Sequence, residues 1–248
     1  MEPLSQVNFR FVLVGCRCVM SRYRLYRLAR VAAVAFSVTL IFGIAAFAQE
    51  RRQGEPGQFD YYILALSWSP SYCEARQGRA RNRSQDRQCD GRPFSFVVHG
   101  LWPQYDRGFP SYCQVPPPRL NRNIVGSMLD LMPSPRLIFH EWDQHGTCSG
   151  LSQRAYFDSV RKARAAVKIP PEYVELERSI SVTPGEVTEA FLKANPGLSP
   201  RAVSVFCDRT WLTEVRICLG KDLSFRDCTE TRRRSCRLDR ARMPAVRN

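Results

Sequence analysis

The chain has 248 residues, and its 37 lysines and arginines outnumber its 23 acidic residues, which gives a formal net charge of +14 at pH 7. No internal repeat or low-complexity block occurs, which excludes a repeat architecture. The charge fits steering toward a polyanionic partner, but a solvated basic face has the same composition, so charge alone does not separate the two.

A basic and then apolar N-terminal segment predicts an export signal. Several arginines precede an apolar run, residues 31–48, which ends in the letters AFA. A basic region, an apolar region and a small-x-small cleavage site are typical of a signal peptide, which we expect over residues 1–48. Met20 is an alternative start. An uncleaved transmembrane anchor is the alternative fate, because the 18 residues of this run approach the length that spans a bilayer.

After cleavage, a flexible leader (49–58) would precede a single domain (59–248). Residues 1–48 hold six basic residues and one acidic residue, so the mature chain keeps 31 basic and 22 acidic residues and a net charge of +9. Its length of about 200 residues suffices for one domain with a sizeable core.

Eight cysteines follow the signal segment, and their even number predicts disulfides. An exported chain folds in an oxidising compartment, where cysteines pair. Zinc binding is the competing use, but no C-x-x-C pair occurs and the spacings are long and irregular. Eight cysteines allow 105 pairings, so their number does not name the bridges. The eight are Cys73, Cys89, Cys113, Cys148, Cys207, Cys218, Cys228 and Cys236.

Two strongly apolar segments near the start of the domain predict buried strands. "FDYYILALSW" (59–68) carries apolar residues at both alternating positions, which indicates a strand covered on both faces. "FSFVVHGLW" (94–102) has the same character, and we expect Gly100 and Pro103 to end it. The polar segment between them (75–93) is predicted to be a surface loop tied by a cysteine.

Helix signals dominate the middle of the chain. After a proline-rich loop (105–120), residues 122–132 predict a short helix and residues 152–169 a longer one with apolar residues at helical spacing. A third helix is predicted over 183–195, because Thr183 fits an N-cap and is followed by a proline and by the glutamate of a capping box.

The C-terminal part returns to strands. "AVSVFCD" (202–208) and "TEVRICL" (213–219) predict two more strands before a tail rich in cysteine and arginine. Strands and helices do not alternate as βαβ units would. The predicted class is therefore α+β, with helices packed against a largely antiparallel central sheet.

The three histidines of the chain gather in two short aromatic segments. His99 lies in "FVVHGLWPQ", and His140 and His145 lie in "IFHEWDQHGTC". A zinc-protease helix needs histidines four residues apart, whereas these two are five apart and lie about 140° apart around a helix. The same periodicity places Glu141 and His145 on one helix face, so Glu141 is predicted to orient His145. A solvent-facing polar helix is the alternative.

Other chemistries fit these segments less well. Cys148 follows the histidines as a cysteine nucleophile would, but a bridged sulfur cannot attack a substrate. A serine hydrolase lacks its G-x-S-x-G signature. His99 and His145 instead predict a general base and a general acid without metal, a pair that suits transfer at phosphorus. A basic surface and nearby aromatic rings would suit an RNA substrate, but the residues alone predict no more than a proton-transfer enzyme that acts on a phosphodiester.

These segments resemble the ribonuclease T2 family. The resemblance is carried by "FDYYILALSWSPSYC" (59–73), "FVVHGLWPQ" (96–104) and "HEWDQHGTC" (140–148), with "TEVRICL" (213–219) also similar. It implies a disulfide-stabilised α+β fold and an exported endoribonuclease without metal or other cofactor. Such an enzyme cleaves single-stranded RNA with low base specificity, through a 2′,3′-cyclic phosphate to 3′-phosphate ends, and leaves DNA intact.

The resemblance also implies roles for residues of the two histidine segments. His145 would be the base on the 2′-hydroxyl and His99 the acid on the 5′ leaving oxygen, with Glu141 assisting at the transition state. His140 and Gln144 would contact the substrate, and Trp102 would form part of a base-binding wall. The implied disulfides are Cys73–Cys89, Cys113–Cys148, Cys207–Cys236 and Cys218–Cys228.

Gln144 departs from the family, which usually has a lysine before the second catalytic histidine. An amide donates hydrogen bonds without the full charge that stabilises a developing anion. Gln144 itself could still donate, or an arginine elsewhere could supply the charge. The departure leaves open a second reading, a catalytically weakened protein that binds RNA or other polyanions. The enzyme is predicted to be secreted or periplasmic, monomeric and free of the membrane once the signal is removed.

Overall fold

The computed structural model describes residues 54–77, 87–228 and 235–246, which lie within one compact unit, residues 52–248. The predicted signal peptide lies outside the described residues. The end of the predicted leader is anchored, because the Gly57 amide donates to the Cys148 carbonyl over 2.9 Å. Within the described ranges, no helix is long and apolar enough to cross a membrane.

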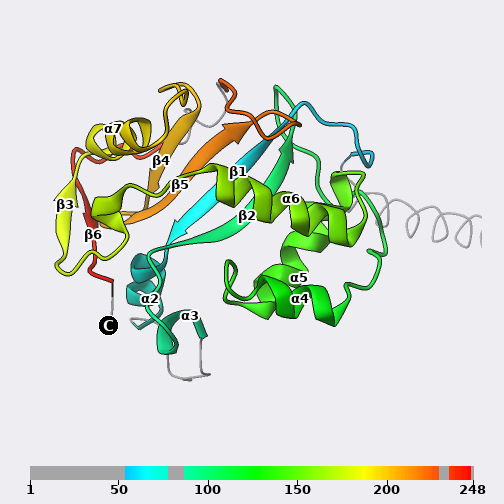
Figure 1. Ribbon diagram of the computed structural model, residues 1–248, viewed down its shortest axis with the longest axis horizontal. Helices are drawn as coiled ribbons and strands as arrows, with labels where there is room; N and C mark the ends of the chain where they lie inside the picture. Colours follow the sequence, from blue (N-terminus) through cyan, green and yellow to red (C-terminus); the bar gives the residue numbers. More distant parts are fainter. Residues whose placement is uncertain (1–53, 78–86, 229–234, 247–248) are drawn as a thin grey trace, which may run out of the picture. The chain divides into compact units, whose positions relative to one another are not determined.

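A four-stranded antiparallel sheet forms the centre of this unit (Figure 1). Its order is β2-β1-β5-β4, so β1 lies between β2, which carries His99, and β5. The class is α+β, as the sequence predicts. The strands are β1 (Tyr61–Trp68), β2 (Phe96–Gln104), β4 (Val203–Cys207) and β5 (Leu212–Leu219), while β3 (Ile180–Val182) and β6 (Ala241–Met243) form a separate pair.

The two faces of β1 pack into two different apolar clusters. Tyr62, Leu64, Leu66 and Trp68 point into the main apolar core, beneath the helices. The other face of β1 belongs to a second, smaller apolar cluster, to which it contributes Tyr61, Ile63 and Ala65. The side chains on this face become smaller along the strand, from Tyr61 to Ala65. Each face is buried, which explains why the sequence shows no polar alternation in this strand.

Helices cover the sheet from several directions. The helices α4 (Arg122–Met128), α5 (Pro135–Gln144) and α6 (Gln153–Ala166) lie together beside β2 in Figure 1. Tyr156 of α6 is fully buried and its hydroxyl donates to the Leu101 carbonyl over 3.0 Å, which ties α6 to the sheet. α7 (Pro184–Ala194) lies near β4 and begins with the predicted capping box.

Three local expectations differ from the structure. β2 continues through Gly100 and Pro103 to Gln104, because β2 is an edge strand and tolerates a residue without an N–H. The helix α2 (Ser69–Gln77) extends into the predicted surface loop, and α3 (Arg87–Asp90) occupies its end. The predicted C-terminal tail includes β6, which pairs with β3.

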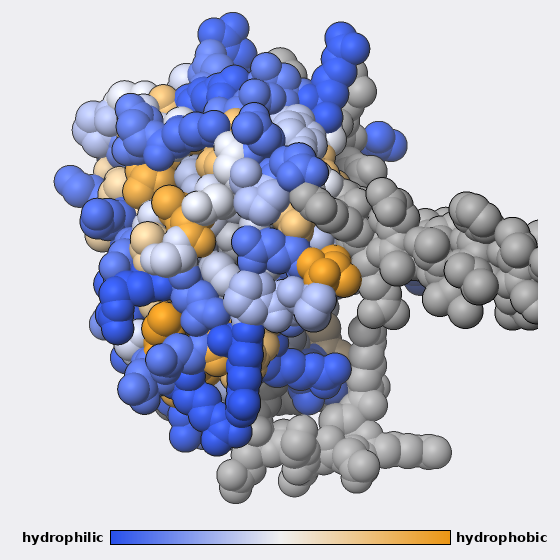
Figure 2. All heavy atoms as spheres, turned by 90° about the vertical axis from the view of Figure 1, so that its right-hand side faces the viewer, coloured by the Kyte–Doolittle hydropathy of each residue, from blue (hydrophilic) through white to orange (hydrophobic). Residues whose placement is uncertain are grey.

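Four disulfides staple the fold, and they join the same pairs that the family resemblance implies: Cys73–Cys89, Cys113–Cys148, Cys207–Cys236 and Cys218–Cys228. Most of the molecular face turned toward the reader in Figure 2 is hydrophilic, with apolar side chains in separate small groups. The apolar residues therefore reside mainly in the core beneath the helices.

Candidate active site

A β-bulge presents His99 to the site. In the pairing of β1 with β2, Ala65 faces Gly100 and Leu66 faces Val98, so His99 has no partner opposite it. A bulge places an extra residue in one strand and re-aims its side chain. His99 leans over the small-residue face of β1 toward β5, and its side chain is 37% exposed.

Gly100 leaves the space that the neighbouring groups fill. A Cβ at this position would lie 1.9 Å from Oε2 of Glu141 and 2.3 Å from Nε1 of Trp102. Those two atoms form a hydrogen bond of 2.7 Å directly against the glycine. In the sequence "VVHGLW", the bulge therefore turns the His99 side chain toward the site, and the missing side chain of Gly100 leaves room for Glu141 and Trp102.

Two carboxylates flank the His99 ring. Nδ1 of His99 lies 2.6 Å from Oε2 of Glu214, and Nε2 lies 3.7 Å from Oε1 of Glu141. Burial lowers the pKa of His99, but the hydrogen bond and charge of Glu214 and the charge of Glu141 outweigh it, so the net shift is upward. His99 is thus disposed to carry a proton at neutral pH.

Glu141 projects from α5 into the interior, where its side chain is 1% exposed. Helical periodicity pairs it with His145, but in the structure its carboxylate contacts Trp102 and faces His99 instead. Burial raises the pKa of Glu141 to about 7, against the charge of His99 and the hydrogen bond from Trp102. A protonated Glu141 can donate a hydrogen bond to an anion, which an ionised one cannot.

His145 caps the C-terminal end of α5 and is nearly buried, at 7% exposure. Its Nδ1 has no hydrogen-bond partner within the described part of the chain. Burial, followed by the charges of His140, His99 and Arg216, lowers the pKa of His145 to about 3. The ring is therefore neutral at neutral pH, and its buried Nδ1 leaves Nε2 as the atom that can accept a proton from a ligand.

Trp102 lies between the two histidines. Its ring stacks on His145 with centroids 5.3 Å apart and meets the edge of His99 at 5.1 Å. The Arg216 guanidinium lies 4.7 Å from the centroid of the same ring. Because Trp102 is only 8% exposed, most of its surface holds neighbouring side chains rather than facing solvent.

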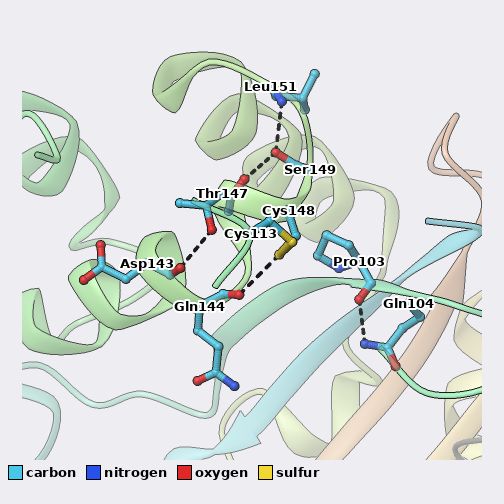
Figure 3. Close-up of a disulfide and its surroundings, with 10 residues drawn as sticks. Pro103, Gln104, Cys113, Asp143, Gln144, Thr147, Cys148, Ser149 and Leu151 are labelled. Carbon is cyan, nitrogen blue, oxygen red and sulfur yellow. Dashed lines mark hydrogen bonds between the residues drawn. A yellow bond between two sulfur atoms is a disulfide. The ribbon is translucent and has the colours of Figure 1, made fainter. Parts of the chain in front are cut away.

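The turn after α5 fixes the residues around Gln144. Cys148 bridges to Cys113, and the Thr147 hydroxyl donates to the Asp143 carbonyl over 2.9 Å (Figure 3). The Gln144 side chain extends away from the disulfide in this view. Its Oε1 accepts from the Tyr112 hydroxyl at 3.3 Å, which leaves the amide NH₂ as the group available to a ligand.

His140 lies one turn before Gln144 on α5 and is exposed. Because the two residues are four apart on the helix, their side chains share one face of α5. The structure brings four of the predicted residues into mutual contact: His99, Trp102, Glu141 and His145. His140 acts on His145 through its charge, and the printed side-chain contact of Gln144 is with Tyr112.

Two functional residues were not singled out from the sequence, Glu214 and Arg216 of β5. Glu214 is buried and its Oε1 lies 2.6 Å from Nε of Arg216. The available signal was a glutamate and an arginine two residues apart, on one face of the otherwise apolar strand "TEVRICL". Arg216 is the arginine from elsewhere that sequence reasoning left open, since its charge acts on both His99 and His145.

Sequence comparisons relate this chain to known ribonucleases. The profile of the Ribonuclease T2 family matches residues 59–228. "Ribonuclease" from Aeromonas hydrophila is 38% identical over 176 residues, which cover 68% of this chain and 76% of that protein. "Probable ribonuclease" from Haemophilus influenzae is 34% identical over 127 residues, which cover 48% of this chain and 47% of that protein.

Solved structures share the fold. An RNase-related protein from Calystegia sepium superposes with a TM-score of 0.62 at 21% identity, over 76% of this chain and 98% of that one. A mutant of RNase MC1 in complex with 5′-UMP gives a TM-score of 0.54 at 24% identity, over 69% of this chain and 93% of that one. The arrangement of sheet and helices described above is the one these proteins have.

Proposed function

The chain belongs to the ribonuclease T2 family and is a T2-type endoribonuclease, and from this premise we propose that it cleaves single-stranded RNA by metal-independent acid–base catalysis. The observation that carries the proposal is the contrast between its two histidines: Nδ1 of His99 lies 2.6 Å from Oε2 of Glu214, whereas Nδ1 of His145 is buried without a partner in the described residues. Burial holds the pKa of His145 at about 3, while burial of His99 is outweighed by Glu214 and Glu141, so that its pKa is raised. At neutral pH one ring can accept a proton and the other can donate one.

The reaction follows from these two states. Nε2 of His145 takes the proton of the 2′-hydroxyl as O2′ attacks phosphorus, and the new P–O2′ bond forms as the P–O5′ bond breaks. Nε2 of His99 gives its proton to the departing O5′. The products are a 2′,3′-cyclic phosphate and a free 5′-hydroxyl. In a second step a water molecule takes the place of O5′ and gives a proton to Nε2 of His99 as its oxygen attacks phosphorus. The P–O2′ bond breaks, Nε2 of His145 returns its proton to O2′, and a 3′-phosphate with a free 2′-hydroxyl results.

Other side chains of the site stabilise the charge that builds on phosphorus. A protonated Glu141 donates to a non-bridging oxygen, and the pKa of about 7, raised by burial, supports this state below neutral pH. His140 and the Gln144 amide contact phosphate from the exposed face of α5. The contacts of Trp102 favour a role in holding Glu141 and His145, with only its small exposed part left for a base.

Exposed aromatic rings near the site supply surfaces for bases. Phe109 and Tyr112 are 48% and 36% exposed on the loop after β2, and the Tyr112 amide donates to the Gln144 carbonyl over 2.9 Å. Bases stack on such rings with little regard to sequence, in keeping with low base specificity. DNA lacks the 2′-hydroxyl nucleophile and is therefore bound, if at all, without cleavage.

An oxidising location fits the four disulfides. We place the mature enzyme in the periplasm or outside the cell, as a monomer without stable membrane association. Its substrate there is single-stranded RNA, and no cofactor is needed.

Purified mature protein incubated with RNA, with DNA and with RNA plus EDTA tests the proposal. We expect cleavage of RNA alone, unaffected by the chelator, and transient 2′,3′-cyclic phosphate ends detected by mass spectrometry. Binding of RNA without turnover would favour the weakened polyanion-binding protein, for which Gln144 is the supporting observation. Loss of cleavage in EDTA would contradict a metal-independent reaction.

A further inference from the structure

Glu214 is a buried carboxylate whose two oxygens contact two different cationic groups. Its Oε2 lies 2.6 Å from Nδ1 of His99, and its Oε1 accepts from Nε of Arg216 over 2.6 Å. The Ser67 hydroxyl adds a longer contact to Oε2 at 3.4 Å. The side chain is 7% exposed, so water competes little for these interactions.

The sheet makes this contact possible across an intervening strand. His99 is on β2 and Glu214 on β5, with β1 between them. Ala65 and Ser67 face the site from β1, and their small side chains leave room for the imidazole to reach β5. The bulge in β2 turns the His99 side chain toward β5. The hydrogen bond to Glu214 therefore depends on the bulge in β2, the small side chains of β1 and the position of Glu214 on β5.

We propose that Glu214 is the positioning residue that makes His99 the general acid, an inference that rests on the proposed ribonuclease function. The carboxylate holds the Nδ1–H, so the other proton of the cationic ring is at Nε2 and faces the leaving oxygen. Glu214 touches no reacting atom and acts through His99 alone.

The proton balance of the step keeps Glu214 ionised throughout. Nε2 of His99 loses its proton to O5′, and the neutral ring keeps the Nδ1–H bonded to Glu214. Burial raises the pKa of Glu214, but the hydrogen bond and charge of His99 and the charge of Arg216 outweigh burial, so the pKa of Glu214 is lowered overall. A lowered pKa disfavours transfer of the proton from Nδ1 to the carboxylate. Carboxylate partners of this kind fix the tautomer and orientation of a histidine.

Arg216 limits the electrostatic cost of this arrangement. An ionised Glu214 beside His99 would repel an anionic phosphodiester, and the guanidinium, whose Nε lies 2.6 Å from Oε1 of Glu214, offsets that charge. The ring of Phe206 lies 3.9 Å from the guanidinium carbon and keeps it in place over the sheet. Glu214 can therefore raise the proton affinity of His99 without leaving the site strongly negative.

The test compares Glu214→Gln with the wild type on two substrates. One is a dinucleoside monophosphate, whose alkoxide leaving group needs a proton; the other is uridine 3′-(4-nitrophenyl phosphate), whose phenolate leaves without one. We expect kcat on the first to fall about 10–100-fold, and kcat on the second to fall less than about 3-fold, because the acid is dispensable there. The alkaline limb of kcat should also move to lower pH.

Glu189→Gln is the matched control, since this glutamate is exposed on α7, and it should leave both rates and the pH profile unchanged. Equal losses on both substrates with an unmoved alkaline limb would show a merely structural role and overturn the proposal. So would unchanged kinetics of Glu214→Gln.

A measurement on the unmodified protein covers the case in which Glu214→Gln does not fold. The ¹⁵N shifts of His99 should report an Nδ1–H in the neutral ring and a pKa above 6.5; an Nε2–H tautomer or a pKa below that value overturns the proposal. Glu214→Asp, which keeps the charge, should retain part of the pKa increase. Failure of the wild type to cleave RNA would instead overturn the ribonuclease function, and the NMR result would stand independently.

Discussion

The two histidines that we propose as acid and base lie in opposite environments. His99, on a bulged edge strand, has carboxylates on both ring nitrogens, at 2.6 and 3.7 Å. His145, at the end of a helix, has none, and its Nδ1 is buried without a partner in the described residues. The same side chain is thus given a raised pKa in one segment and a lowered one in the other, by carboxylates that outweigh burial at His99 and by burial at His145.

The difference shows that the contacts of each histidine are determined by the fold rather than by the neighbouring residues in the sequence. Glu141 comes from the segment of His145, yet its carboxylate faces His99. Trp102 comes from the segment of His99, yet its ring stacks on His145. Each motif supplies the partner of the other histidine, so neither segment would function if it were transplanted alone.

Removing either ring is the most severe way to test this division. His99→Ala and His145→Ala should each reduce kcat on a dinucleoside monophosphate about 10²–10⁴-fold, as expected for loss of a proton-transfer group. The nitrophenyl substrate separates them, because it needs a base but no acid. Activity on it should be largely retained in His99→Ala and lost in His145→Ala.

The opposite pattern, retention in His145→Ala and loss in His99→Ala, would reverse the assignment of acid and base. Circular dichroism and thermal unfolding of both variants establish that the fold is intact before the rates are compared.

Gly100→Ala disturbs the point at which the two environments meet. The new Cβ would lie 1.9 Å from Oε2 of Glu141, so the carboxylate or the Trp102 ring must move. Displacement of catalytic groups by about 1 Å can cost about 10²-fold in rate, and we expect a loss of this order in kcat. Gly126→Ala is the control, because a Cβ there has nothing within 4 Å. Equal activity of the two variants would show that this packing is not needed.

Sequence reasoning proposed His99, Glu141 and His145, which lie close together in the structure, but it did not predict all of their contacts. Spacing predicted the strands and the capped helix, because these depend on local periodicity. The partner of Glu141 depends on how α5 packs against β2, which no single segment encodes. Glu214 was overlooked for the same reason, since it meets His99 only after β5 and β2 pair with opposite edges of β1.

The pH dependence should reveal both environments at once. Because burial lowers the pKa of His145 to about 3, the base stays neutral down to acidic pH; because carboxylates raise the pKa of His99, the acid stays protonated above pH 6.5. We expect kcat to hold over mildly acidic pH, to decline near pH 7 as Glu141 loses the proton it donates, and to fall further once His99 loses its own.

Stability should follow a different course. Between pH 6.5 and about 3, His145 is protonated in the unfolded chain but stays neutral in the folded protein. The free energy of unfolding should therefore decrease as the pH falls through this window. Urea unfolding at several pH values measures the trend. His145→Gln should flatten it, and an unchanged slope in that variant would contradict the lowered pKa of His145.

The smallest expected effect is at Gln144, which precedes His145 and offers an amide where a cation would stabilise the transition state. Gln144→Lys should raise kcat on RNA several-fold, about 3–10-fold, because a full charge replaces a dipole near the phosphate. The gain is limited because Arg216 already acts on both histidines and because the Tyr112 hydroxyl, 3.3 Å from Oε1, loses its acceptor. Gln144→Met, which is neutral and cannot donate, should lower the rate. An unchanged or lower rate in a folded Gln144→Lys variant would mean that the charge of Arg216 is enough to stabilise the transition state, and that the lack of a charge at position 144 does not limit the rate.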